Sequence, residues 1–99
     1  MLHLVILTHG ADTCAAADAE VGEKAYSGSG QLEVGSKKHG VTVEGFWVDP
    51  PGHRFYLLAD APNAHAVSEL MVELQLFHWN TVDIHAVITV KEAMTLMAH

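Results

Sequence analysis

The chain has 99 residues, of which 49% are hydrophobic, and its 12 acidic and 5 basic residues give a formal net charge of −7. A chain of this length has room for one hydrophobic core, so we expect one domain over residues 1–99. The acidic charge, with no basic cluster larger than Lys37-Lys38, argues against nucleic acid and anionic membrane as partners. The apolar runs are too short to span a bilayer and no basic leader precedes them, which predicts a cytoplasmic location.

The spacing of apolar residues predicts alternating strands and helices. In chain order we expect a strand at 2–8, a helix at 15–39, a strand at 41–49, a strand at 53–60, a helix from Pro62, a strand at 81–90 and a short helix at 91–99. Pro50-Pro51-Gly52 would make the turn between the second and third strands. The first helix is expected to turn inward a face of small and apolar residues, namely Val21, Ala25, Gly28, Leu32 and Gly35.

This order of elements, βαββαβ, predicts an α+β fold of the ferredoxin-like type, with an antiparallel sheet in the strand order 4-1-3-2. The strands at 2–8 and 53–60 are apolar on both sides, as central strands are, whereas the other two carry polar residues such as Glu44 and Asp83. Both helices would cover the same face of the sheet. The second face then needs a cover, and a partner's sheet is the simplest one, which predicts a homodimer.

The predicted topology brings polar residues to one end of the sheet, because the first strand ends where the third begins. His9, Cys14 and His53 lie at that end, together with Asp12 and Asp49. Imidazole and thiolate are preferred ligands for zinc, copper and iron. We therefore expect His9, Cys14 and His53 to bind a transition metal, with Asp12 or Asp49 as a fourth ligand or as a partner that orients a histidine. The spacing matches neither C-x-x-C nor H-E-x-x-H.

Two functions without a metal remain open. In the first, Cys14 lies at the start of the first helix, where the helix dipole favours the thiolate, and acts as a nucleophile with His9 as its base. Such a protein would be a cofactor-independent enzyme acting on a small molecule, of the monooxygenase or isomerase kind. In the second, the protein is a non-catalytic binding or stress-response module, and its cleft would be lined by the aromatic residues Trp47, Trp79, Phe55 and Tyr56.

Residues 8–14 read Thr-His-Gly-Ala-Asp-Thr-Cys, a T-H-x-x-D-x-C arrangement. In this motif and in its order of elements, the chain resembles a family of small ferredoxin-like proteins that has no settled activity. The wider resemblance is to the dimeric α/β-barrel superfamily, which includes cofactor-free monooxygenases, muconolactone isomerase-like enzymes, haem-degrading proteins and stress-response proteins. The resemblance implies the fold, a homodimer and a site that includes His9, Asp12 and Cys14. A reaction carried over from the superfamily would be analogy alone.

Overall fold

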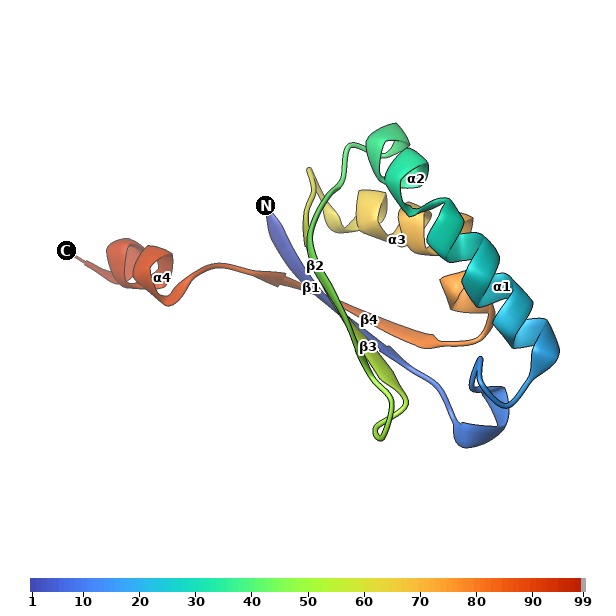
Figure 1. Ribbon diagram of the computed structural model, residues 1–99. Helices are drawn as coiled ribbons and strands as arrows, with labels where there is room; N and C mark the ends of the chain where they lie inside the picture. The colour runs from blue at the N-terminus through green and yellow to red at the C-terminus, as the bar shows by residue number, and fades with distance from the viewer. Residues whose placement is uncertain (99) are drawn as a thin grey trace.

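The structure is a computed structural model that describes residues 1–98 (Figure 1). Its elements in chain order are β1 Leu2–Thr8, the short 3-10 turn η1 Ala11–Thr13, α1 Ala19–Gly30, α2 Leu32–Lys38, β2 Thr42–Asp49, β3 Arg54–Asp60, α3 Ala64–Glu73, the 3-10 turn η2 Leu76–His78, β4 Thr81–Val87 and α4 Val90–Met97. No helix within this part of the chain is long and apolar enough to cross a membrane.

The four strands form one antiparallel sheet in the order β2-β3-β1-β4, which confirms the predicted α+β fold and strand order. Val5 on β1 lies between Leu57 on β3 and Ile84 on β4, so the central strand has apolar neighbours on both sides. Along β1 burial alternates, because successive side chains point to opposite faces of the sheet. The register between β2 and β3 shifts at Glu44, where a bulge accommodates this polar residue on the edge strand.

Helices α1, α2 and α3 all lie on one side of the sheet, and the core fills the space between the two layers (Figure 1). The predicted inner face of the first helix is confirmed at its most buried positions, since Val21, Gly28 and Gly35 are buried. Gly28 allows close approach there, because a Cβ atom at this position would overlap the Leu74 carbonyl group. From α3, the residues that fill the core are Ala66, Val67, Leu70 and Met71.

The helix predicted over residues 15–39 is wrong in its bounds and in its continuity. The helix begins only at Ala19, because the Asp18 carboxylate accepts hydrogen bonds from the amides of Glu20 and Val21 at 2.9 and 3.1 Å. An aspartate at this position satisfies amides that have no partner inside the helix. Gln31 then separates α1 from α2.

The C-terminal elements also shift. The last strand ends at Val87 rather than at residue 90, because the Thr89 hydroxyl caps a new helix by accepting from the Glu92 amide at 3.0 Å. The predicted helix at 91–99 corresponds to α4, and its final residue, His99, lies outside the described part of the chain.

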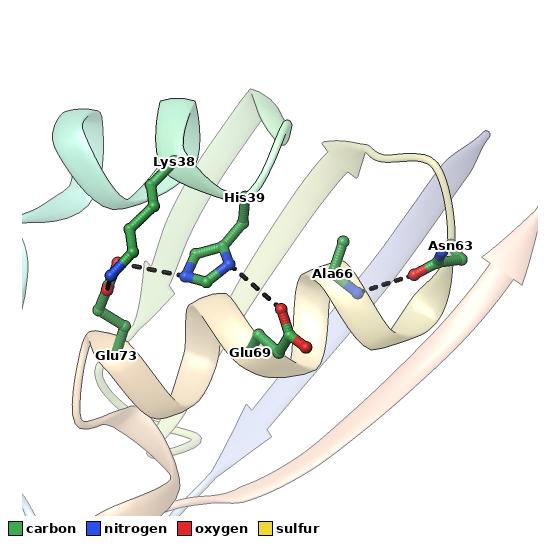
Figure 2. A network of polar contacts seen from close by, with 6 residues as sticks. All are labelled: Lys38, His39, Asn63, Ala66, Glu69 and Glu73. Carbon is green, nitrogen blue, oxygen red and sulfur yellow. Dashed lines mark hydrogen bonds and ion pairs between the residues drawn. The ribbon is translucent and has the colours of Figure 1, made fainter.

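Polar contacts join α2 to α3 at the end of the molecule opposite to the β2–β3 turn (Figure 2). The Lys38 ammonium group donates to Glu73 Oε1 at 2.7 Å, and this hydrogen bond lowers the pKa of Glu73 while it raises the pKa of Lys38. His39 lies between two carboxylates, with its Nδ1 atom 3.3 Å from Glu69 and its Nε2 atom 3.3 Å from Glu73. The side chain of Asn63 caps the start of α3 by accepting from the Ala66 amide at 2.9 Å.

Candidate metal centre

Three side chains with metal-binding atoms meet at the end of the sheet where β1 stops and β3 starts. Strand pairing places them there, since Thr8 is opposite Arg54 and the next amide, that of His9, donates to the His53 carbonyl at 3.1 Å. The loop after β1 then brings Cys14 back to the same place. One ligand atom from each of His9, Cys14 and His53 lies within 4.8 Å of the others, and all three residues are half-buried. This is the one such group within the described residues.

Asn80 sets the orientation of the His9 ring. The Asn80 Nδ2 group donates to the Leu76 carbonyl at 3.1 Å, so the Asn80 Oδ1 atom is the one that faces His9. The His9 Nδ1 atom lies 3.0 Å from this oxygen and must therefore carry the proton in the hydrogen bond. The lone pair of neutral His9 is consequently on Nε2. Ring nitrogens of metal-binding histidines have this arrangement, with one nitrogen donating to an oxygen and the other free to bind.

His53 has a backbone conformation that side chains other than glycine rarely adopt, with φ at 52°. The residue closes the β2–β3 turn, where its amide donates to the Pro50 carbonyl at 3.2 Å. A non-glycine residue in this conformation costs about 1–2 kcal/mol. The Nδ1 atom of His53 is buried and has no hydrogen-bond partner within residues 1–98. The turn therefore contains both a strained backbone and an unpaired nitrogen next to His9, and each lowers the free energy of unfolding.

A cavity of about 240 Å³ adjoins the three side chains. Apart from His9, Cys14, His53 and Asp49, its walls are apolar and consist of Ala15, Ala16, Val48, Pro50, Phe55 and Trp79. The His9 ring packs against two of these walls, with its centroid 5.0 Å from Trp79 and 5.9 Å from Phe55. The site thus combines a few donor atoms with an apolar chamber, as small-molecule sites do.

The comparisons with known proteins place the chain in a family. Residues 1–99 match the family described as a domain of unknown function (DUF3303). The chain belongs to the DUF3303 family. None of the curated proteins matches it.

Two solved structures share the fold of this DUF3303 chain. The protein SCO4226 from Streptomyces coelicolor A3(2) is 21% identical, with a TM-score of 0.55 over 88% of this chain and 96% of that one. A protein provisionally named as a transposase from Deinococcus radiodurans R1 is 16% identical, with a TM-score of 0.54 over 98% of this chain and 86% of that one. Identities this low show the fold alone.

The two aspartates expected at the site lie outside the group of three. Asp12 is exposed on the η1 turn, and the Asp49 carboxylate, although it borders the cavity, accepts from the Gly52 amide at 3.1 Å. Their roles as ligands stay predictions. The residue that orients His9 is Asn80, for which the sequence predicted no role, although its place just before the last strand puts it at this end of the sheet.

The structure alters two further expectations for this DUF3303 chain. Cys14 precedes the start of α1 by five residues, and its carbonyl oxygen accepts from the amides of Ala17 and Asp18. Cys14 therefore lies outside the first turn of α1, where the sequence analysis had placed it. Of the aromatic residues expected around a cleft, Phe55 and Trp79 line the cavity. The others, Trp47 and Tyr56, are paired across β2 and β3 on the opposite face of the sheet.

Proposed function

We propose that this DUF3303 protein binds a transition metal ion through His9, Cys14 and His53. The observation that carries the proposal is the convergence of their ligand atoms to within 4.8 Å from three separate segments of the chain. Two details of the surroundings support it. The bond to Asn80 leaves His9 Nε2 free, and the buried Nδ1 atom of His53 lacks a partner within the described residues. A metal ion can bind His9 Nε2 directly. A bond from the metal to His53 Nδ1 would remove the free-energy cost of leaving that buried nitrogen without a partner.

The ligand types select the class of metal. Two imidazoles and one thiolate suit zinc, copper and iron, whereas magnesium and calcium prefer oxygen ligands. In a tetrahedral zinc site with bonds of about 2.0–2.3 Å, neighbouring ligand atoms are roughly 3.3–3.6 Å apart. The present spacing, up to 4.8 Å, is slightly wider. We expect the loop that carries Cys14 to close by about an ångström when the metal binds.

Three protein ligands leave one position of a tetrahedral metal open, as in zinc sites that bind a substrate or water. That position would face the cavity of about 240 Å³, whose walls are mainly apolar. The proposed function is therefore a metal centre that accepts a small, largely apolar molecule with one donor atom. Binding of that molecule would bury its apolar part against Phe55 and Trp79.

The test is metal analysis of protein purified without an affinity tag or chelator, followed by titration with Zn²⁺, Cu²⁺ and Co²⁺. We expect about one ion per chain for the wild type and a loss of binding in H9A, C14S and H53N. His65 on α3 is exposed and lies outside the group, so H65A is the matched control for the removal of an imidazole. With Co²⁺, a thiolate-to-metal charge-transfer band should appear in the near ultraviolet and vanish in C14S.

Two results would contradict the proposal. One is a wild type that binds none of these ions after reconstitution. The other is metal binding that H65A weakens as much as H9A does, because this would assign the binding to scattered surface histidines. Circular dichroism of each variant shows whether a loss of binding reflects unfolding instead.

A further inference from the structure

The cavity at the proposed metal centre is the first of three spaces that follow one another between the sheet and the helices. A narrow second cavity of about 80 Å³ adjoins it, and a wider cleft of about 640 Å³ follows beside the edge strand β2. Phe55 and Trp79 border both cavities, and Ser29 and Leu32 border both the second cavity and the cleft. Helices α1 and α2 follow one another along the same side of the sheet (Figure 1). All three spaces therefore lie along the boundary between the same two layers.

Strand β2 gives the direction and the length of this row of spaces. Val48 borders the first cavity, Phe46 borders the second, and Val43 borders the cleft, so the row runs from the end of the strand towards its start. The extended chain from Val43 to Val48 spans roughly 16 Å. A saturated chain of about twelve carbon atoms has this length, given C–C bonds of about 1.5 Å. A molecule that starts at the metal can therefore extend well beyond the first cavity.

The walls along the row are mainly apolar. Those of the second cavity include Ala25, Phe46, Leu74 and Leu76. In the cleft the apolar surface continues through Leu32, Val41 and Val43, and the two charged residues there, Glu33 and Lys37, are paired at 3.3 Å. Burial of polar groups without partners costs free energy, so these walls favour a hydrocarbon chain.

The head of the bound molecule is specified by charge and by one unpaired donor. A divalent ion bound by two neutral imidazoles and one thiolate retains a net charge of about +1, which favours a monoanion as the fourth ligand. The carboxylate that borders this cavity, that of Asp49, accepts from the Gly52 amide in its own turn. The Trp79 ring lies 5.0 Å from that of His9, and its Nε1 atom is buried without a partner within residues 1–98. Trp79 is 7% exposed, and its N–H group can only donate.

We propose that the molecule bound at the metal centre is a linear monocarboxylate of about eight to twelve carbon atoms, a medium-chain fatty acid. One carboxylate oxygen binds the metal, and the other accepts from the Trp79 N–H group. The chain passes Phe55 and Leu32 and ends in the cleft beside β2. This inference rests on the proposed metal centre and adds to it the class of the bound molecule.

Calorimetric titration of the zinc-loaded protein with butanoate, octanoate and dodecanoate tests the path of the chain. We expect the affinity to rise by about two- to fourfold for each methylene group that enters the row. Ala25→Leu fills the second cavity and should abolish most of this increment between octanoate and dodecanoate. Ala64→Leu makes the same change at an exposed position of α3 and should leave the increment intact. Ser29→Leu, at an exposed position that borders the second cavity and the cleft, provides a second block if A25L unfolds.

The head is tested separately from the chain. Trp79→Phe keeps an aromatic ring but removes the N–H group, so it should weaken all three carboxylates by about tenfold without changing the increment per methylene. A W79F variant that changes the increment instead would overturn the hydrogen bond, since Trp79 would then act through packing. Methyl octanoate has no anionic oxygen and should bind at least tenfold more weakly than octanoate. Equal binding of the ester and the acid would overturn the carboxylate head.

Zinc titration of A25L separates this inference from the metal centre on which it rests. Ala25 is outside the group of three ligands, so A25L should bind zinc as the wild type does. A zinc-loaded wild type whose affinity is independent of chain length would overturn the inference and leave the metal centre standing. Equal increments in A25L and A64L would overturn the path through the second cavity. Equal octanoate affinities with and without zinc would overturn the bond between carboxylate and metal.

Discussion

The imidazole of His9 and the side-chain amide of Asn80 are joined by a hydrogen bond of 3.0 Å between Nδ1 and Oδ1, although 71 positions of sequence separate them. The two residues meet because β1 and β4 are neighbours in the sheet, and Asn80 directly precedes β4. The bond determines which nitrogen of His9 faces the cavity. It therefore links the order of the strands to the chemistry of the proposed metal centre.

Replacing Asn80 should weaken metal binding although Asn80 is not a ligand. In N80A the His9 ring loses the acceptor that orients it, and loss of such a partner typically lowers metal affinity by about 10- to 100-fold. N80D retains an acceptor for His9 Nδ1 and should lose less affinity than N80A. Competition with a chromogenic chelator measures both values. Equal affinities for the wild type and N80A would exclude this orienting role.

His53 should lower the stability of the metal-free protein while its imidazole contributes to metal binding. In metal-free protein, H53G should be more stable than H53A by about 1 kcal/mol, because glycine adopts the positive φ of this turn without strain. Both variants remove the imidazole and should lose the metal. Urea unfolding with and without Zn²⁺ separates the two effects. If H53G and H53A unfold at the same urea concentration, the backbone at this position is not strained.

His3 should be replaceable by an apolar residue with a gain in stability. Its side chain is 0% exposed, and neither ring nitrogen has a hydrogen-bond partner in the described part of the chain. A buried polar group without a partner costs about 1–3 kcal/mol. His3→Leu should therefore raise the free energy of unfolding by up to this amount, as measured by urea denaturation. A destabilised H3L would show that the imidazole makes a hydrogen bond in solution.

The Lys38–Glu73 ion pair should make stability depend on pH. The pKa of Glu73 is lowered by its hydrogen bond with Lys38, so its contribution is present above the usual carboxyl pKa of about 4.3 and is lost as the pH falls through the folded value. The pKa of Lys38 is raised, so its contribution is lost only as the pH rises above its usual value of about 10.4. E73Q should be less stable than the wild type at pH 7, and the difference should disappear in acid.

Salt provides the second check on this pair. Both side chains reach solvent, so high ionic strength should reduce the difference between E73Q and the wild type. E33Q breaks the more exposed Lys37–Glu33 pair, whose atoms are 3.3 Å apart, and should have a smaller effect. A difference at pH 7 that persists unchanged into acid would indicate that Glu73 acts through packing rather than through its charge.

The sequence alone determined the fold class, the strand order and the end of the sheet where His9 and His53 lie. It did so because apolar periodicity reports which faces are buried, and because a βαββαβ order has few ways to cover a sheet. The start of the first helix was predicted wrongly, since a glycine-rich segment with mixed periodicity gives little indication of where Asp18 caps it.

Only the tertiary structure decided that Cys14 lies beside His9 and His53 and that Asn80 orients His9. It also decided that the Asp49 carboxylate accepts a hydrogen bond from the Gly52 amide within the β2–β3 turn. These relations depend on loop conformation and on side-chain direction, which are set by contacts between residues distant in sequence and leave no periodic pattern. The direction in which α4 leaves the sheet is likewise decided by the tertiary structure. The amphipathic spacing of this helix can be read from the residues, but its separation from its own core can be seen only in the folded chain.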